Sequence, residues 1–265
     1  MHRAATWRKY LIGNEDVILE KRKMYHNIII HFPYSIDNAI DTTIKRDLPR
    51  TSFKGSQWLN KDILKSIDTL LYQYVQVMPC DGYMQGFAYI MAVLYYTYET
   101  HDKEHALADT FWSFASVISI IRPLIPDHDP EHFLRYTKEW KKYYMYNIEC
   151  RDKRTHMWLK PFYDMITPTL SVKWIMIWFS QQFDLENLLI IWDAIITCEP
   201  TQRTKLFGII ASNITIQNST SIEKWAEQHP TEIGPRIMSI GGTDAKIIIE
   251  ESRNAMIQYK IPSII

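Results

Sequence analysis

The chain of 265 residues has few cysteines, and Cys80, Cys150 and Cys198 are the three that it contains. They lie far apart and form no C-x-x-C pair, which argues against a disulfide framework and against a structural zinc site. Such sparse use of cysteine is typical of proteins of the reducing cytosol. We expect the three thiols to be buried and inert.

A net charge is also lacking, because 30 lysine and arginine residues balance 30 aspartate and glutamate residues. A neutral chain has no overall field that would draw it to nucleic acid or to an anionic membrane, so no nucleic acid is expected as a partner. The sequence contains no P-loop and no G-x-G-x-x-G motif. We therefore expect the chain to bind no nucleotide by itself.

Long hydrophobic runs are absent as well. Arg8 and Lys9 come before any long apolar stretch, so the N-terminus lacks the apolar region of a signal peptide. The longest stretch without a charged residue covers residues 82–98, close to the lower limit for a membrane span, but it contains Gln85, two glycines and five tyrosines. We interpret it as a helix in the core of a cytoplasmic protein with no transmembrane segment.

Glycine numbers only 8 residues, and apolar residues recur at helical spacing along nearly the whole chain. Ile36, Ile40 and Ile44, for example, step by four residues, as expected for one face of a helix packed on its neighbours. We find no convincing pair of strands. The prediction is an all-α chain, in which Asp129 and Ser171 are N-caps of the helices that follow them.

No stretch is rich enough in glycine, serine or proline to be a linker, and no internal repeat is present. We expect a single domain over residues 1–265. Two prolines, Pro123 and Pro126, and a polar turn interrupt the helical pattern. This interruption predicts a boundary between two lobes, one of about residues 1–122 and one of about residues 123–265.

One arginine follows a helix that a proline should end. Pro49 cannot lie inside a helix without losing a hydrogen bond, so we expect the helix to end near Asp47 and Arg50 to stand on a short, rigid turn. Asp47 would hold the turn or the guanidinium by a charge-assisted hydrogen bond. An outward arginine suits phosphoryl transfer, where it stabilises the charge on a second protein's phosphates by about 10³- to 10⁵-fold in rate. The alternative is a surface Asp–Arg pair of little energetic value.

One glutamine opens the long apolar helix. A turn at residues 79–82 precedes it, and the pattern places Gln85 in the first turn of a helix that ends near Tyr98. A side-chain amide both donates and accepts, which is what orienting an attacking water requires. Gly86, without a Cβ, would let another backbone come close. The alternative is a buried amide satisfied by neighbouring carbonyl groups.

Two short motifs, together with further segments in the same order, resemble the TBC domain family of Rab GTPase activators. The first motif is I-x-x-D-x-x-R-T at residues 44–51, and the second is G-Y-x-Q-G at residues 82–86. The further segments lie at residues 3–13, which look like R-x-x-x-W-x-x-L-L-G, at residues 108–112, and at residues 178–193, which end in I-W-D.

The sequence departs from the family's pattern at two motif positions, and residues 121–170 show no clear family pattern. Ile190 stands where the family's L-R-I-W-D has arginine, and Phe87-Ala88 stands where M-N usually follows the second motif. The arginine of the first motif, Arg50, and the glutamine of the second, Gln85, are both present.

The resemblance implies a wholly helical, V-shaped array of two lobes and a Rab GTPase-activating function. In that family an arginine finger neutralises charge at the phosphates, and a glutamine finger, supplied in trans, positions water in place of the Rab's own glutamine. By resemblance these catalytic roles fall to Arg50 and Gln85. The residues that the resemblance implies as supports of the fingers are Ile44, Asp47, Tyr83 and Gly86.

The implied partner is a Rab-family small GTPase in its GTP-bound form, whose active site the chain completes without being an enzyme itself. The resemblance implies no cofactor of its own, since GTP and Mg²⁺ are carried by the GTPase. It also implies a role in vesicle trafficking and a cytoplasmic location, peripheral on endomembranes, with membrane contact only through the Rab. The alternative is a catalytically inactive, TBC-like scaffold that binds Rab or other trafficking proteins. Intact Arg50 and Gln85 favour the activator, because a scaffold needs neither.

Two segments match H-x-x-E-H, a zinc-hydrolase pattern that needs both histidines on one helix face. Residues 101–105 bridge two predicted helices and are expected to form a polar loop. In residues 128–132, the N-cap at Asp129 and the proline after it leave His128 outside the helix. We therefore expect no metal site, and stoichiometric metal in the purified protein would support the hydrolase instead.

Overall fold

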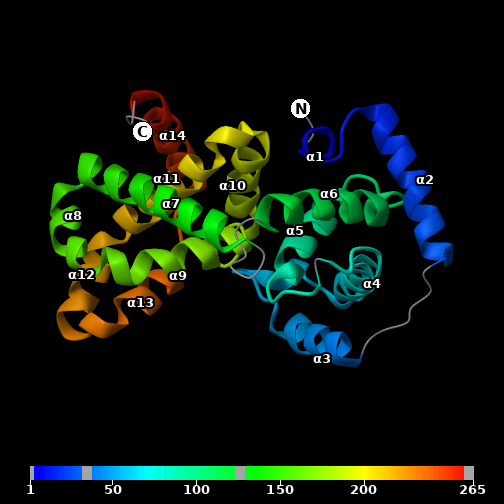
Figure 1. The fold of residues 1–265 in the computed structure, drawn as a ribbon, viewed down its shortest axis with the longest axis horizontal. Coiled ribbons are helices and arrows are strands. Elements are labelled where there is room, and N and C mark those ends of the chain that lie inside the picture. Colours follow the sequence, from blue (N-terminus) through cyan, green and yellow to red (C-terminus); the bar gives the residue numbers. More distant parts are fainter. Residues whose placement is uncertain (1–2, 32–37, 81, 123–128, 260–265) are drawn as a thin grey trace. The chain divides into compact units, whose positions relative to one another are not determined.

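The computed structural model describes residues 3–31, 38–80, 82–122 and 129–259 (Figure 1). Over these residues the chain forms α-helices and short 3₁₀ helices and contains no strand. The prediction of an all-α chain is confirmed. Ile36, the first residue of the predicted stripe, lies outside the described residues, whereas Ile44 is fully buried.

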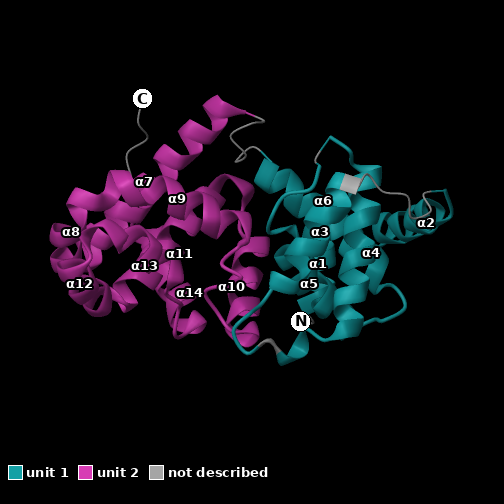
Figure 2. Cartoon of the chain, turned by 90° about the horizontal axis from the view of Figure 1, so that it is seen from below, with its two compact units in different colours: residues 1–123 teal, residues 124–265 magenta. Residues whose placement is uncertain are grey.

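The chain divides into two compact units, residues 1–123 and residues 124–265 (Figure 2). The division falls next to residue 122, where the sequence predicts the boundary between lobes. Both motifs, at residues 44–51 and 82–86, belong to unit 1.

Unit 1 contains α1 (Arg3–Leu11), α2 (Glu15–His31), α3 (Asn38–Asp47), η1 (Leu48–Arg50), η2 (Ser56–Trp58), α4 (Lys61–Val77), α5 (Phe87–Glu99) and α6 (Ala106–Ile121). Helix α5 packs against α4 and α6, and residues 90–94 are fully buried. Aromatic side chains fill the space between these helices, and the rings of Tyr74 and Phe114 meet edge to face with centroids 4.7 Å apart. Residues 87–98 of the uncharged stretch therefore belong to the core helix of unit 1. No helix in the described ranges is long and apolar enough to cross a bilayer.

A buried carboxylate fixes the N-terminal helices to this core. Asp109 on α6 accepts hydrogen bonds from Arg22 at 2.8 and 2.7 Å and from Arg8 at 3.1 Å, and its side chain is only 1 % exposed. A charge buried so completely is tolerated only when it is paired. The hydrogen bonds with Asp109 raise the pKa of Arg22 above its ordinary value. Helices α1 and α2 are thus joined to α6 by one ionic cluster.

Unit 2 contains α7 (Pro130–Arg151), α8 (Lys153–Leu159), η4 (Lys160–Phe162), α9 (Tyr163–Met176), α10 (Leu185–Thr197), η5 (Pro200–Gln202), α11 (Arg203–Gln217), α12 (Ser219–Gln228), η6 (Pro230–Glu232), α13 (Ile233–Ser239) and α14 (Ala245–Gln258). Helix α11 is buried along residues 205–215. Helix α7 approaches it closely at Gly208, where a Cβ would lie 2.9 Å from the Trp140 carbonyl oxygen. Only glycine allows this contact.

Helices α7, α11 and α14 share a buried polar network of Asn147, Ser212, Asn213 and Ser252. The Asn147 amide donates to Ser212 at 2.6 Å and to Asn213 at 2.8 Å. The Asn213 amide in turn donates to Ser252 at 3.0 Å. Because buried polar groups are costly when unpaired, these bonds make the network a stabilising part of the core.

The structure confirms one predicted helix start and contradicts the other. Asp129 caps α7, since its side chain accepts from the His132 N–H at 2.8 Å. Ser171 is not an N-cap, because α9 begins at Tyr163 and continues through Pro168. The proline removes one backbone hydrogen bond without ending the helix. The Ser171 hydroxyl donates to the Pro168 carbonyl at 2.9 Å inside the helix.

The expectation of buried thiols is wrong. Cys80 and Cys150 are exposed, and Cys198 is half-buried. Cys80 follows the end of α4, Cys150 lies in the last turn of α7, and Cys198 directly follows α10. At such helix ends the chain leaves the core, so residue type alone misjudges their burial.

Candidate functional site

The arginine segment follows the predicted course. Helix α3 ends at Asp47, and residues 48–50 form the 3₁₀ helix η1 with Pro49 in its first turn. The Thr51 N–H donates to the carbonyl oxygens of Asp47 at 3.0 Å and Leu48 at 3.1 Å, which closes the turn. Arg50 is exposed at the end of η1.

The glutamine segment differs from the prediction. Helix α5 begins at Phe87, so Gln85 lies in the turn before the helix and not in its first turn. The physical reason is Gly86, the N-cap, whose φ of 108° lies in the left-handed region that interrupts a helix and that glycine adopts readily. Gln85 is exposed, which excludes the alternative of a buried, satisfied amide.

The two segments are hydrogen-bonded to each other although they lie far apart in the sequence. The Tyr83 hydroxyl donates to the Asp47 carboxylate at 3.0 Å. Burial, the negative charge of Asp47 and this hydrogen bond raise the pKa of the Tyr83 phenol, which keeps it a neutral donor. The Asp47 carboxylate therefore bridges to the second motif, and it holds neither the turn nor the Arg50 guanidinium as the sequence suggested.

A second hydrogen bond joins the arginine segment to α5, and the sequence did not predict it. The Tyr89 hydroxyl, in the first turn of α5, donates to the Arg50 carbonyl oxygen at 3.3 Å. The Thr51 hydroxyl also donates to the Asp47 carbonyl at 3.0 Å. Tyr89 lies three residues after the second motif, and the sequence contains no signal that its hydroxyl would reach the first.

Both candidate finger side chains are available to a partner. Within the described part of the chain, neither the Arg50 guanidinium nor the Gln85 amide has a hydrogen-bond or ion-pair partner. The alternative of an Asp47–Arg50 surface pair is therefore not what the structure shows. The segments below them are held by Tyr83, Asp47 and Tyr89. The site thus consists of the exposed Arg50 guanidinium and Gln85 amide, on two segments that hydrogen bonds hold together.

The described residues of the two histidine motifs gather no metal ligands. Residues 101–105 form the loop between α5 and α6. In this loop the Nδ1 atom of His105 lies 3.6 Å from a carboxylate oxygen of Asp102. Among the residues that the structure describes, no group of three or more histidine, cysteine, aspartate or glutamate side chains is placed to hold a metal. His128 of the second motif lies outside them.

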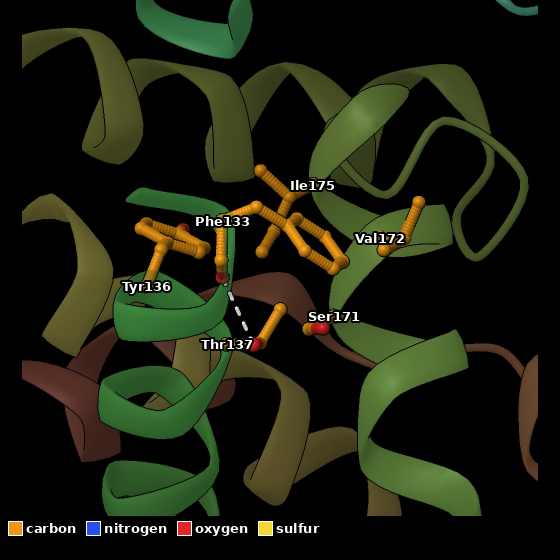
Figure 3. A pocket seen from close by; sticks show the side chains of 6 residues that line it. All are labelled: Phe133, Tyr136, Thr137, Ser171, Val172 and Ile175. Carbon is orange, nitrogen blue, oxygen red and sulfur yellow. Dashed lines mark hydrogen bonds between the residues drawn. The ribbon is translucent and has the colours of Figure 1, made fainter. Parts of the chain in front are cut away.

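Unit 2 also contains hollows between its own helices. One lies between α7 and α9 and is lined by Phe133, Tyr136, Thr137, Ser171, Val172 and Ile175, with no carboxylate, imidazole or thiol among them (Figure 3). The other, of about 350 Å³, is mostly apolar and includes Cys198 and Arg253. Neither has an arrangement of acid, base and nucleophile that would indicate catalysis.

Comparison with known proteins shows the family. The model of the Rab-GTPase-TBC domain matches residues 1–221. The chain belongs to this family. The segments of its TBC domain that carry the two motifs, residues 44–51 and 82–86, lie within the matched range.

Several curated relatives are TBC proteins. The chain is 29 % identical to TBC1 domain family member 13 of Mus musculus over 139 residues, which covers 49 % of this chain and 33 % of the relative, and the values for Homo sapiens are the same. It is 26 % identical over 199 residues to TBC domain-containing protein C1952.17c of Schizosaccharomyces pombe, which covers 66 % of this chain and 30 % of the relative. The chain thus spans about a third of the length of these relatives.

The fold agrees with a solved TBC-type structure. The crystal structure of the Ypt/Rab-GAP domain of Gyp1p matches with a TM-score of 0.70 at 18 % identity, covering 97 % of this chain and 87 % of that domain. At this identity the match shows the fold alone. The predicted TBC-type helical fold is confirmed.

Proposed function

We propose that this TBC domain activates GTP hydrolysis by a Rab-family small GTPase, with Arg50 as an arginine finger and Gln85 as a glutamine finger. The proposal rests on one observation. The Arg50 and Gln85 side chains are exposed and have no partner within the described residues, and the segments that carry them hydrogen-bond to each other through Tyr83 and Asp47. Such an arrangement presents two groups together without using either for folding.

The chemistry of the two groups suits hydrolysis of a bound phosphate. A guanidinium is planar and permanently charged, so Arg50 neutralises the charge that develops on the phosphate oxygens. The Gln85 amide accepts from and donates to the attacking water, in place of the Rab's own glutamine. In this proposal GTP and Mg²⁺ belong to the GTPase, and the chain is not an enzyme by itself.

Four residues support the fingers in this proposal. Ile44 anchors α3 through its fully buried side chain, and Asp47 and Tyr83 join the two segments. Gly86 provides the left-handed backbone that places Gln85 before α5. Each acts on the position of a finger and none touches the nucleotide.

The relatives support the partner class. The solved domain of Gyp1p is a Ypt/Rab-GAP domain, and the matching family model is that of the Rab-GTPase-TBC domain. Our proposal extends this to a GTP-bound Rab as the partner of this chain. It also gives the chain a role in vesicle trafficking, in the cytoplasm and at membranes reached through the Rab.

The test is GTP hydrolysis by a panel of purified, GTP-loaded Rabs with and without the protein. At least one Rab is expected to be accelerated by about 10³-fold or more. Binding to that Rab should be tighter in the GDP-aluminium-fluoride form than with a GTP analogue, because the fingers complement the transition state.

The opposite results would identify a different function. If no Rab is accelerated, or if the two nucleotide forms bind equally and Arg50→Ala changes neither affinity, the domain is a catalytically inactive scaffold. A scaffold recognises the switch conformation of its partner and needs neither finger.

A further inference from the structure

Tyr89 reaches the backbone of the arginine segment from the first turn of α5. Its hydroxyl donates to the Arg50 carbonyl oxygen at 3.3 Å and accepts from the Ser52 N–H at 3.4 Å. Its ring meets Phe53 edge to face, with centroids 5.2 Å apart. The Tyr89 side chain thus contacts the main chain at two positions, Arg50 and Ser52.

An aromatic cluster of Phe53, Trp58, Tyr89 and Tyr96 extends this contact. Phe53 is buried and packs on Trp58 at 4.7 Å, and Trp58 packs on Tyr96 at 5.0 Å. Tyr89 and Tyr96 both belong to α5. The chain that follows Arg50 is therefore packed on the same helix that begins two residues after Gln85.

We propose that Tyr89 is a positioning residue for the arginine finger, fixing the Arg50 backbone relative to α5 and so relative to Gln85. The inference rests on the function proposed above. Tyr83 holds Asp47, three residues before Arg50, whereas Tyr89 holds Arg50 itself and Ser52. The arginine segment is then fixed at both ends by tyrosines that flank the glutamine.

The contribution of Tyr89 should be seen in catalysis more than in folding. The two hydrogen bonds are longer than the usual range, so each is weak. Catalysis is more sensitive, because a misplacement of about 1 Å in a catalytic group can lower a rate by about 10²-fold. When only the hydroxyl is removed, we expect kcat to fall about 10-fold. This loss is smaller than the loss of about 10²-fold that a misplacement of about 1 Å can cause.

The first experiment compares Tyr89→Phe with Tyr96→Phe, using the GTP-loaded Rab that responds most strongly in the panel. Tyr89→Phe removes the hydroxyl and keeps the ring against Phe53. It should lower kcat about 10-fold at unchanged KM. Tyr96→Phe makes the same chemical change in the same cluster and should stay within about twofold. Equal kcat in wild type and Tyr89→Phe would overturn the proposal.

A double-mutant comparison tests whether Tyr89 acts through Arg50. In an Arg50→Ala background there is no finger to position, so adding Tyr89→Phe should cause no further loss. A full additional 10-fold loss would show that Tyr89 acts independently of Arg50, which contradicts the proposal.

Amide hydrogen exchange gives a readout that needs no GTPase. The Ser52 N–H donates to Tyr89, so its exchange should be faster in Tyr89→Phe and unchanged in Tyr96→Phe. Unchanged exchange in Tyr89→Phe would refute the positioning role. If no Rab is accelerated by the wild-type protein, the proposed function fails, whereas the exchange result still decides whether Tyr89 fixes the segment.

Discussion

The finger segments of unit 1 and the buried polar network of unit 2 use similar chemical groups in opposite ways. In the network, the side chains of Asn147, Ser212, Asn213 and Ser252 satisfy one another inside the core. In the finger segments, Tyr83 and Asp47 pair beneath two polar side chains that stay exposed. The amide of Asn213 supports the fold, whereas that of Gln85 does not.

This difference separates stability from activity. A polar group with buried partners contributes to folding, because its removal leaves those partners unsatisfied. A polar group without partners is free to bind a second molecule. Substitutions of Arg50 and Gln85 should therefore change hydrolysis and leave stability nearly constant, and substitutions in the buried polar network should do the reverse.

The largest effect is expected at Arg50. Arg50→Ala and Arg50→Lys should each lower the stimulated hydrolysis of GTP by the Rab by about 10³-fold or more, since lysine lacks the planar, multi-donor fork. Single-turnover GTP hydrolysis measures the loss, and thermal denaturation should show an unchanged melting temperature. Retention of more than about a tenth of the activity in the lysine variant would contradict a finger role.

Gln85→Ala should lower stimulated hydrolysis by about 10²-fold, comparable with the loss of one positioned donor in other enzymes. The wild-type protein should also accelerate a Rab whose own switch glutamine has been replaced, because the water is positioned in trans. The same single-turnover assay measures both. Loss of all stimulation with the substituted Rab would show that Gln85 does not replace that residue.

Asn213→Leu tests the other side of the comparison. It removes the partner of Asn147, Arg151 and Ser252, and should lower the free energy of unfolding by about 2 kcal/mol. Urea denaturation measures this change, and hydrolysis by the folded fraction should be unaffected. Asn254→Leu, at an exposed position of α14, is the matched control and should change stability by less than about 0.5 kcal/mol. A similar loss in both variants would contradict a special role of the network.

Tyr83→Phe should have the smallest effect. Loss of the hydrogen bond to Asp47 should lower kcat about fivefold, equivalent to about 1 kcal/mol. The raised pKa of the phenol keeps it protonated, so its contribution is fully present below the ordinary tyrosine pKa of 10 and is lost only at higher pH. The rate ratio of wild type to variant should be constant from about pH 6 to 9, since the phenol does not titrate there. A ratio that falls within this range would be inconsistent with a neutral donor.

The start or end of a helix was predictable from the sequence where a single residue determines the local backbone conformation. Pro49 ends α3 at Asp47, and Asp129 caps α7, because both residues act on their immediate neighbours. The helical class follows from spacing that repeats over most of the chain. Ser171 failed as a cap because Pro168 is accommodated within α9, which depends on the helix's surroundings.

The arrangement of the candidate site was predictable only in part. Motif spacing identified Arg50 and Gln85, but their roles stay predictions. The contacts between Tyr83 and Asp47 and between Tyr89 and Arg50 join residues 36 and 39 positions apart, so they depend on the tertiary fold of unit 1. The start of α5 after Gln85 depends on the φ of Gly86, which a helical pattern does not reveal.

The absence of partners for Arg50 and Gln85 within the described residues has an evolutionary consequence. Because neither side chain stabilises the domain, a point mutation at either position should leave the free energy of unfolding unchanged. After a gene duplication, one copy could lose Arg50 or Gln85 and still fold to the same abundance. If the proposed roles hold, only selection on GTP hydrolysis would preserve these two residues, and a copy without them would differ from the original in its hydrolysis rate but not in its stability.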